Sequence, residues 1–191
     1  MTRPRYDLEL LLDVAIDEFT KRGYDGTSIT HLAAATGLSK SSLYHHVQGK
    51  EHILRLGLER AVTPLLGVID EPGALEGPAI DRLTYVLHRQ IGILAEQIAA
   101  VTLLLRVRGN TATERWALQR RREFDTFVAG LVRAGVDEGD LRADLDPTLV
   151  ARLLSGTVNS LTEWYRPGRG ALSPDELADA VLSSSLAGLR A

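Results

Sequence analysis

A short run of cationic, hydroxyl and imidazole side chains carries the chemistry of this sequence. It occupies the exposed arc of an expected helix and comprises Lys40, Ser41, Ser42, Tyr44, His45 and His46. Such groups donate hydrogen bonds to phosphate oxygens and to base edges in the major groove. Ser39 precedes the run as an N-cap, and Leu43 is expected to point inward. The pattern favours a surface that binds double-stranded DNA.

Other kinds of chemistry find little support in the residue types. The sequence has no cysteine, which excludes disulfides, thiolate metal sites and cysteine nucleophiles. His45 and His46 are adjacent, so on a helix they point about 100° apart. No carboxylate completes a ligand set with them or with His52, and His31 has no evident partner. There is no G-x-S-x-G elbow and no Gly-rich phosphate loop. We therefore expect no metal, no cofactor and no enzymatic activity.

Three helices are needed to position the polar run. An apolar repeat at helical spacing predicts a first helix from Asp7 to Gly23. A second helix begins at an N-cap, Thr27 or Ser28, and ends at Gly37, which tolerates a left-handed backbone. The polar run forms the third. This predicts a helix-turn-helix domain over residues 1–48. Its basic start, with Arg3 and Arg5, is either an arm that touches DNA or a solvated terminus.

The remaining residues, 49–191, show helical periodicity and no strand-like alternation. A connecting helix over 49–69 starts with Lys50, whose place in the first turn suits a phosphate. Further helices are expected over 79–107, with a break near 96–100, over 111–137, from 147 and from 174. Residues 70–78 are expected to form a loop. The predicted fold class is all-α, with about nine helices in a helix-turn-helix domain and a C-terminal bundle for ligand binding and dimerisation.

The segment around the polar run resembles the TetR family of bacterial one-component regulators. The matching residues are Thr27-Ser28-Ile29, Leu32-Ala33, Gly37-Leu38-Ser39-Lys40, Leu43-Tyr44-His45-His46 and Lys50-Glu51. Two positions depart from the family pattern. Ser41 stands where the family often has glycine, which changes a potential DNA contact, and Val47 stands where it often has phenylalanine. The resemblance is carried by motifs over residues 7–55 and by general layout over 56–191.

The resemblance implies a transcriptional repressor that binds a palindromic operator as a homodimer and is released by a small apolar or amphipathic ligand. It implies phosphate contacts from Tyr44, His45 and Lys50. It implies approach to base edges by Lys40, Ser41 and Ser42. Thr27 and Ser28 are expected where the motif's first helix meets the DNA backbone, and Ser39 completes the set of candidate DNA-binding residues.

A sensor of this kind needs a ligand site in its body. Helical bundles hold small molecules in mostly apolar cavities with a few polar anchors. The candidate lining residues are Gln97, Val101, Leu105, Trp116, Phe124, Phe127, Asn159 and Trp164. Residues of these types more often form ordinary core than a ligand pocket. The segment Trp164–Gly168, followed by Leu172-Ser173-Pro174, is similar to family members that regulate lipid or sterol breakdown and sense acyl-CoA thioesters.

The last two helices are apolar over a wide arc, which fits either a bundle core or a subunit interface. In the resembled family they form a four-helix dimer interface, which lets two recognition helices reach successive major grooves. The net charge of −3 argues against a general nucleic-acid coat. With no bilayer-length apolar run and no signal-peptide core, we expect a cytoplasmic protein with no membrane partner. The alternatives are a helical protein-binding adaptor that does not read DNA and a small enzyme on a helical scaffold.

Overall fold

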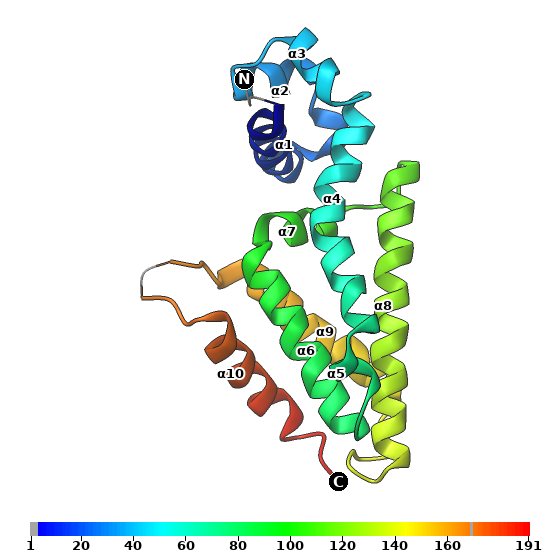
Figure 1. The fold of residues 1–191 in the computed structure, drawn as a ribbon. Coiled ribbons are helices and arrows are strands. Elements are labelled where there is room, and N and C mark those ends of the chain that lie inside the picture. Colours follow the sequence, from blue (N-terminus) through cyan, green and yellow to red (C-terminus); the bar gives the residue numbers. More distant parts are fainter. Residues whose placement is uncertain (1–3, 169) are drawn as a thin grey trace. The chain divides into compact units, whose positions relative to one another are not determined.

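The protein is described by a computed structural model that covers residues 4–168 and 170–191, with side chains from residue 8 onward. These residues form ten α-helices and one short 3-10 helix and contain no strand, which confirms the all-α fold class (Figure 1). An isolated bridge pairs Leu141 with Arg190. No described helix combines the length and apolar character needed to cross a membrane. The basic arm with Arg3 and Arg5 lies outside the described side chains.

By its internal contacts the chain divides into two compact units. The first contains the residues up to Ala61 and Ala99–Leu118, and the second contains Val62–Ile98 and Gln119–Ala191. A division at residues 48 and 49 stays a prediction, since the unit that holds the first three helices also takes in residues from later in the chain.

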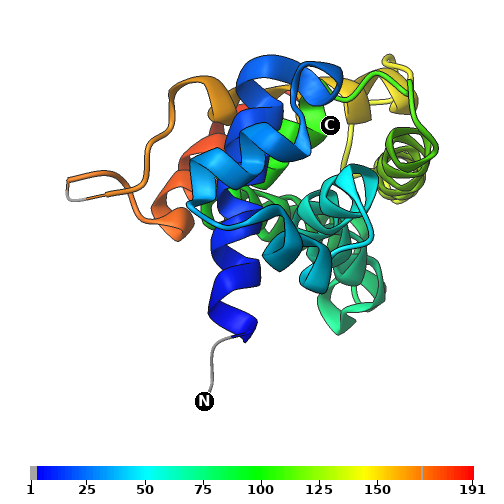
Figure 2. The same ribbon diagram turned by 90° about the horizontal axis from the view of Figure 1, so that it is seen from above.

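The first unit is built on three N-terminal helices, α1 (Pro4–Gly26), α2 (Ile29–Thr36) and α3 (Lys40–His46). α2 packs against both α1 and α3 (Figure 2). The start of α4 (Lys50–Gly67), nearly all of α7 (Ile98–Arg106) and the start of α8 (Ala112–Asp137) belong to the same unit. Its fully buried side chains include Leu11, Leu32, Leu43, Leu54 and Leu58. Burying these leucines fixes the angle at which α3 is presented.

The second unit centres on α6 (Ala79–Glu96), which packs against α9 (Pro147–Trp164) and α10 (Pro174–Leu186) (Figure 1). The expected break after α6 is confirmed, since α7 begins at Ile98. The helix starts expected at residues 147 and 174 are confirmed as well. Asp146 accepts from the Leu149 N–H at 2.9 Å, and Ser173 forms a capping box with Glu176. These local signals place both C-terminal helices.

The expected loop over residues 70–78 is wrong for part of its length. The structure forms a 3-10 turn, η1 (Val68–Asp70), and a single-turn helix, α5 (Pro72–Leu75), in and beside this segment. Pro72 stands at the first helical position, where its fixed φ favours a helix and its missing N–H costs nothing. The proline and glycine that indicated a loop therefore also fit one short turn of helix.

The backbone leaves helical geometry at Gly23, where the sequence predicts the end of the first helix. Gly23 has φ 76° and ψ 161°, a conformation open almost only to glycine. We expect Gly23→Ala to lower the free energy of unfolding by about 1–3 kcal/mol. A Cβ at this position would meet nothing within 4 Å, so the loss would report backbone strain and not a clash.

Urea denaturation followed by circular dichroism measures this change. Gly92→Ala is the matched control, because Gly92 lies inside α6 with open space around an added Cβ. That change should be neutral or stabilise by up to about 1 kcal/mol, since alanine favours a helix interior. Equal stabilities for the two variants would contradict the strain at Gly23.

Candidate nucleic-acid interface

The helix α3 presents the polar run on the surface of the first unit. Ser39 caps it, with its Oγ accepting from the Ser42 N–H at 3.1 Å and lying 2.9 Å from the Ser41 Oγ. Leu43 is fully buried and anchors the helix, whereas Tyr44 is 57% exposed. Lys40, Ser41 and His45 are exposed, while Ser42 and His46 are half-buried. The arrangement leaves donors of several kinds free to meet a polyanion.

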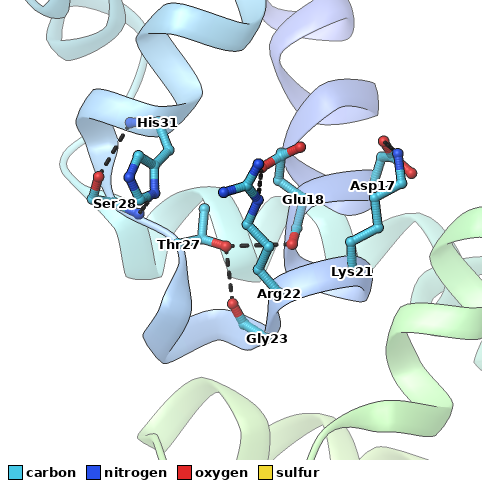
Figure 3. Close-up of polar contacts among 8 residues, drawn as sticks. All are labelled: Asp17, Glu18, Lys21, Arg22, Gly23, Thr27, Ser28 and His31. Carbon is cyan, nitrogen blue, oxygen red and sulfur yellow. Dashed lines mark hydrogen bonds and ion pairs between the residues drawn. The ribbon is translucent and has the colours of Figure 1, made fainter.

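The start of α2 is held by a reciprocal pair of hydrogen bonds (Figure 3). The Ser28 Oγ accepts from the His31 N–H at 3.1 Å, and His31 Nδ1 accepts from the Ser28 N–H at 3.4 Å. His31 therefore has a hydrogen-bond partner at the start of its own helix, which the sequence pattern did not indicate. Serine with histidine three positions later is a less familiar capping box than serine with glutamate, and this explains why the pattern was missed.

Thr27 lies inside the fold and not on its surface. Its side chain is 1% exposed, and its Oγ1 donates to the Gly23 carbonyl at 2.9 Å and lies 3.3 Å from the Glu18 carbonyl (Figure 3). The hydroxyl is consequently engaged at the junction of α1 and α2 and does not face a phosphate. This corrects the expected DNA contact of Thr27, whose role here is to set the angle of α2.

Lys50 is held by a residue that the sequence pattern did not indicate. Its Nζ donates to the Tyr24 carbonyl at 2.8 Å and lies 4.0 Å from the centroid of the Tyr24 ring. The same ring contacts Phe19, with 5.6 Å between centroids. A lysine ammonium has three N–H donors. Tyr24 therefore orients Lys50 while leaving donors for another acceptor.

Three long-range contacts join the segment 99–118 to α1 and α4 within the first unit. The Thr113 N–H donates to Glu51 Oε1 at 3.1 Å. Arg106 Nη1 donates to the Thr20 carbonyl at 2.7 Å. The Arg55 guanidinium lies over the Trp116 ring, 3.2 Å from its centroid. Because Glu51 and Arg55 follow Lys50 on α4, these contacts tie the segment to the helix that carries Lys50.

The eight candidate ligand-lining residues are spread over both units. Val101, Leu105 and Trp116 belong to the first unit, and Gln97, Phe124, Phe127, Asn159 and Trp164 belong to the second. Phe124 is buried, and Trp164 is 59% exposed, with its ring edge-on to Tyr165. The other six are half-buried. Trp164 therefore faces solvent in this chain, and the remaining seven stay candidates.

A buried and a half-buried polar side chain in the second unit, Gln90 and Asp125, were not among the predicted site residues. Gln90 is 8% exposed, and its Oε1 has no hydrogen-bond partner. Burial raises the pKa of Asp125, against smaller opposing effects of Arg121 and of the Ser155 hydroxyl, which donates at 3.4 Å. The sequence feature that could have indicated Gln90 is its place within the apolar stripe of the helix expected over 79–107. Such groups are the polar anchors that a mostly apolar ligand site needs.

Asp125 gives a prediction about the dependence of stability on pH. Its pKa is raised in the folded protein, so its ionised form opposes folding. Asp125→Asn should therefore be more stable than wild type at neutral pH. The advantage should shrink as the pH falls through the raised pKa and vanish below the unfolded value of about 3.9. Thermal unfolding from pH 3 to 8 measures it. Exposed Asp140→Asn is the control, and parallel curves for Asp125→Asn and wild type would contradict the prediction.

The helix α9 carries an exposed apolar stripe. Three of the seven exposed large hydrophobic side chains among the described residues lie on it, namely Leu149, Leu153 and Trp164. Their spacing of four and eleven residues puts them on one face. Small exposed residues lie between them and on α10, namely Gly156, Ser160, Ser183 and Ser184. Exposed apolar side chains flanked by small residues allow close packing against another helix pair.

No group of three or more His, Cys, Asp or Glu side chains in the described part of the chain is placed to hold a metal ion. The feature that stands out is the helix-turn-helix surface of the first unit. Residues 11–56 match the family model described as bacterial regulatory proteins, tetR family. Residues 76–189 match the model described as tetracyclin repressor-like, C-terminal domain.

Individual relatives agree with the family models. The chain is 32% identical over 184 residues to the HTH-type transcriptional repressor KstR2 of Rhodococcus jostii, covering 94% of this chain and 89% of the relative. It is similar to SCO3833 from Streptomyces coelicolor, with 52% identity, a TM-score of 0.88 and coverage of 95% and 91%. The fold also matches AibR solved with isovaleryl coenzyme A and operator DNA, at 24% identity, a TM-score of 0.75 and coverage of 93% and 97%.

Proposed function

The chain belongs to the TetR family of bacterial regulators, and on that premise we propose that it binds a palindromic operator as a homodimer and leaves it when a small apolar or amphipathic ligand binds. Its membership of this family and its similarity to named repressors identify it as a DNA-binding transcriptional repressor. The observation that carries the finer proposal is the α3 surface, on which Tyr44 and its polar neighbours are exposed above a fully buried Leu43.

The proposed DNA contacts are those that the resemblance to the TetR family implies. Tyr44, His45 and Lys50 contact phosphates, and Lys40, Ser41 and Ser42 approach base edges. Ser28 and Ser39 cap the two motif helices and orient their N-termini, whose backbone N–H groups attract phosphate oxygens. Thr27 acts from inside the fold, through the α1–α2 junction.

Two copies of the chain are proposed to pair through α9 and α10. One seven-residue helix reaches few base pairs, so useful specificity requires two. A two-fold dimer places its recognition helices in major grooves about 34–36 Å apart. The exposed α9 stripe of Leu149, Leu153 and Trp164 supports this face as the interface, because a two-fold axis would bury the stripe against its own copy.

The proposed effector binds in the second unit and is an acyl-CoA thioester. Two observations support a ligand there: the buried, unpartnered Oε1 of Gln90 and the pKa of Asp125 raised by burial. The choice of a thioester rests on AibR, whose structure holds isovaleryl coenzyme A. A ligand that prefers a body conformation with misplaced recognition helices must lower operator affinity.

Fluorescence anisotropy with DNA from the region upstream of the protein's own gene tests the proposal. We expect nanomolar binding that weakens steeply with salt, because bound lysines and arginines release counterions from the phosphates. A random-sequence duplex should bind far more weakly. Adding acyl-CoA thioesters of increasing chain length should release the operator, whereas coenzyme A alone should not. Absence of sequence-selective binding would contradict the repressor proposal and favour a protein-binding adaptor.

A further inference from the structure

A cavity of about 360 Å³ lies inside the first unit, close to the DNA-binding helices. The end of α1 supplies Phe19 and Tyr24, α4 supplies Leu54, and α7 with its following loop supplies Leu103, Arg106 and Arg108. Its size falls within the range of small-molecule sites. The described lining shares no residue with the eight ligand candidates of the sequence analysis, so this is a separate place in the fold.

The walls of the cavity combine an apolar interior with two cations. Phe19, Leu54 and Leu103 are buried, whereas Arg106, which also donates to the Thr20 carbonyl, and Arg108 are exposed. The acidic residue in the wall, Glu114, is already engaged, since its Oε2 accepts from the N–H groups of Gly109 and Asn110 at 2.7 Å each and of Arg108 at 3.2 Å. A guanidinium suits a planar carboxylate. The cavity thus favours an apolar chain with an anionic head.

The cavity touches the residue that orients Lys50. Tyr24 lines it, and the same Tyr24 accepts from Lys50 Nζ through its carbonyl and lies beneath the ammonium with its ring. Tyr24 follows Gly23, whose unusual backbone turns the chain at this point and which also lines the cavity. An occupant that pushes on the Tyr24 ring therefore disturbs the position of Lys50.

We propose that this cavity is a second ligand site, that it takes a small aliphatic carboxylate, and that its occupant displaces Tyr24 from Lys50 and so weakens operator binding. The first two parts stand without the proposed function. The last part rests on it, because Lys50 matters for affinity only if the protein binds DNA.

Binding is measured by isothermal titration calorimetry on the full-length protein without DNA. The probes are octanoate, octan-1-ol and octylammonium, which share a chain and differ in head group. We expect saturable binding of octanoate at one site per chain and at least tenfold weaker binding of the other two. Arg106→Ala and Arg108→Ala should each weaken octanoate binding several-fold, and Arg133→Ala, an exposed arginine elsewhere, should not. Equal affinity for the three probes would overturn the proposal.

Filling the cavity provides an independent check. Val107→Phe places a large ring at the wall from a loop position, and Leu103→Phe does so from α7. Either variant that keeps the wild-type circular dichroism spectrum should lose octanoate binding at least tenfold. Undiminished binding in a folded variant would place octanoate elsewhere and overturn the assignment.

The link to Lys50 is tested by nuclear magnetic resonance of lysine labelled at Cε. The chain has three lysines, Lys21, Lys40 and Lys50, so their signals are assigned by substitution. The Tyr24 ring should shift the Lys50 signal in the free protein. Octanoate should move that signal toward the value found in Tyr24→Leu and leave the other two in place.

An unmoved Lys50 signal at saturation would overturn the coupling. If octanoate moves it but no operator is bound, the proposed function fails while the site stands.

Discussion

Leu153→Glu is expected to turn the proposed dimer into a monomer and to remove operator binding at concentrations where the wild type is saturated. Leu153 is 58% exposed in the single chain and lies between Leu149 and Trp164 on one face of α9. A charge there costs the isolated chain little, because it stays in water. At a two-fold interface the change occurs twice, and burying an unpaired carboxylate costs several kcal/mol.

Light scattering coupled to size-exclusion chromatography gives the mass, and anisotropy gives the operator affinity. Leu75→Glu is the matched control. Leu75 is 56% exposed on α5, away from the stripe, so this variant should remain dimeric and bind the operator. Circular dichroism should show wild-type helix content for both variants. A Leu153→Glu protein with the dimer mass would contradict the proposed interface.

Tyr44→Ala is expected to weaken operator binding about 100-fold without loss of stability. A hydrogen bond to a charged group contributes about 1.5–3 kcal/mol, and a dimer loses it twice. A loss near the lower end of that range in each half-site corresponds to about 100-fold. Tyr44 is 57% exposed, whereas its neighbour Leu43 is fully buried, so truncation at Tyr44 leaves the core of the unit intact.

The measurement pairs operator anisotropy with thermal unfolding. Tyr44→Phe separates the hydroxyl from the ring, and it should resemble the alanine variant if the phosphate contact carries the effect. Leu75→Ala removes a similarly exposed side chain far from α3 in sequence and should leave operator affinity unchanged. Wild-type affinity in Tyr44→Ala would show that α3 does not read DNA through this residue.

Sequence reasoning succeeded where the deciding interactions are local. Ser173 and Glu176, three residues apart, are enough to start α10, and Gly37 is enough to end α2. The exposed arc of α3 follows from one helix of seven residues with a buried Leu43. For such elements the pattern of residue types and the structure carry the same information.

It failed where partners are distant in the chain. Lys50 meets Tyr24 26 residues away, and Arg55 meets Trp116 on another helix. The family resemblance implies a DNA-backbone contact for Thr27, yet the packing of α1 against α2 buries this residue. A ligand site assembled from several helices also brings together residues that are distant in the chain. Its lining therefore does not follow from the residue type at single positions.

The attachment of residues 99–118 to the first unit bears on how DNA specificity can be exchanged between relatives. A chimaera cut after residue 48 would carry α3 but leave behind Glu51 and Arg55, together with Thr113 and Trp116, which they contact. Such a hybrid contains the DNA-binding surface of α3 without the contacts that hold the neighbouring helix α4 in this protein. Transplanting residues up to 61 together with 99–118 keeps both sides of each contact. The unit that can be exchanged between relatives therefore consists of two segments that are separated in the sequence.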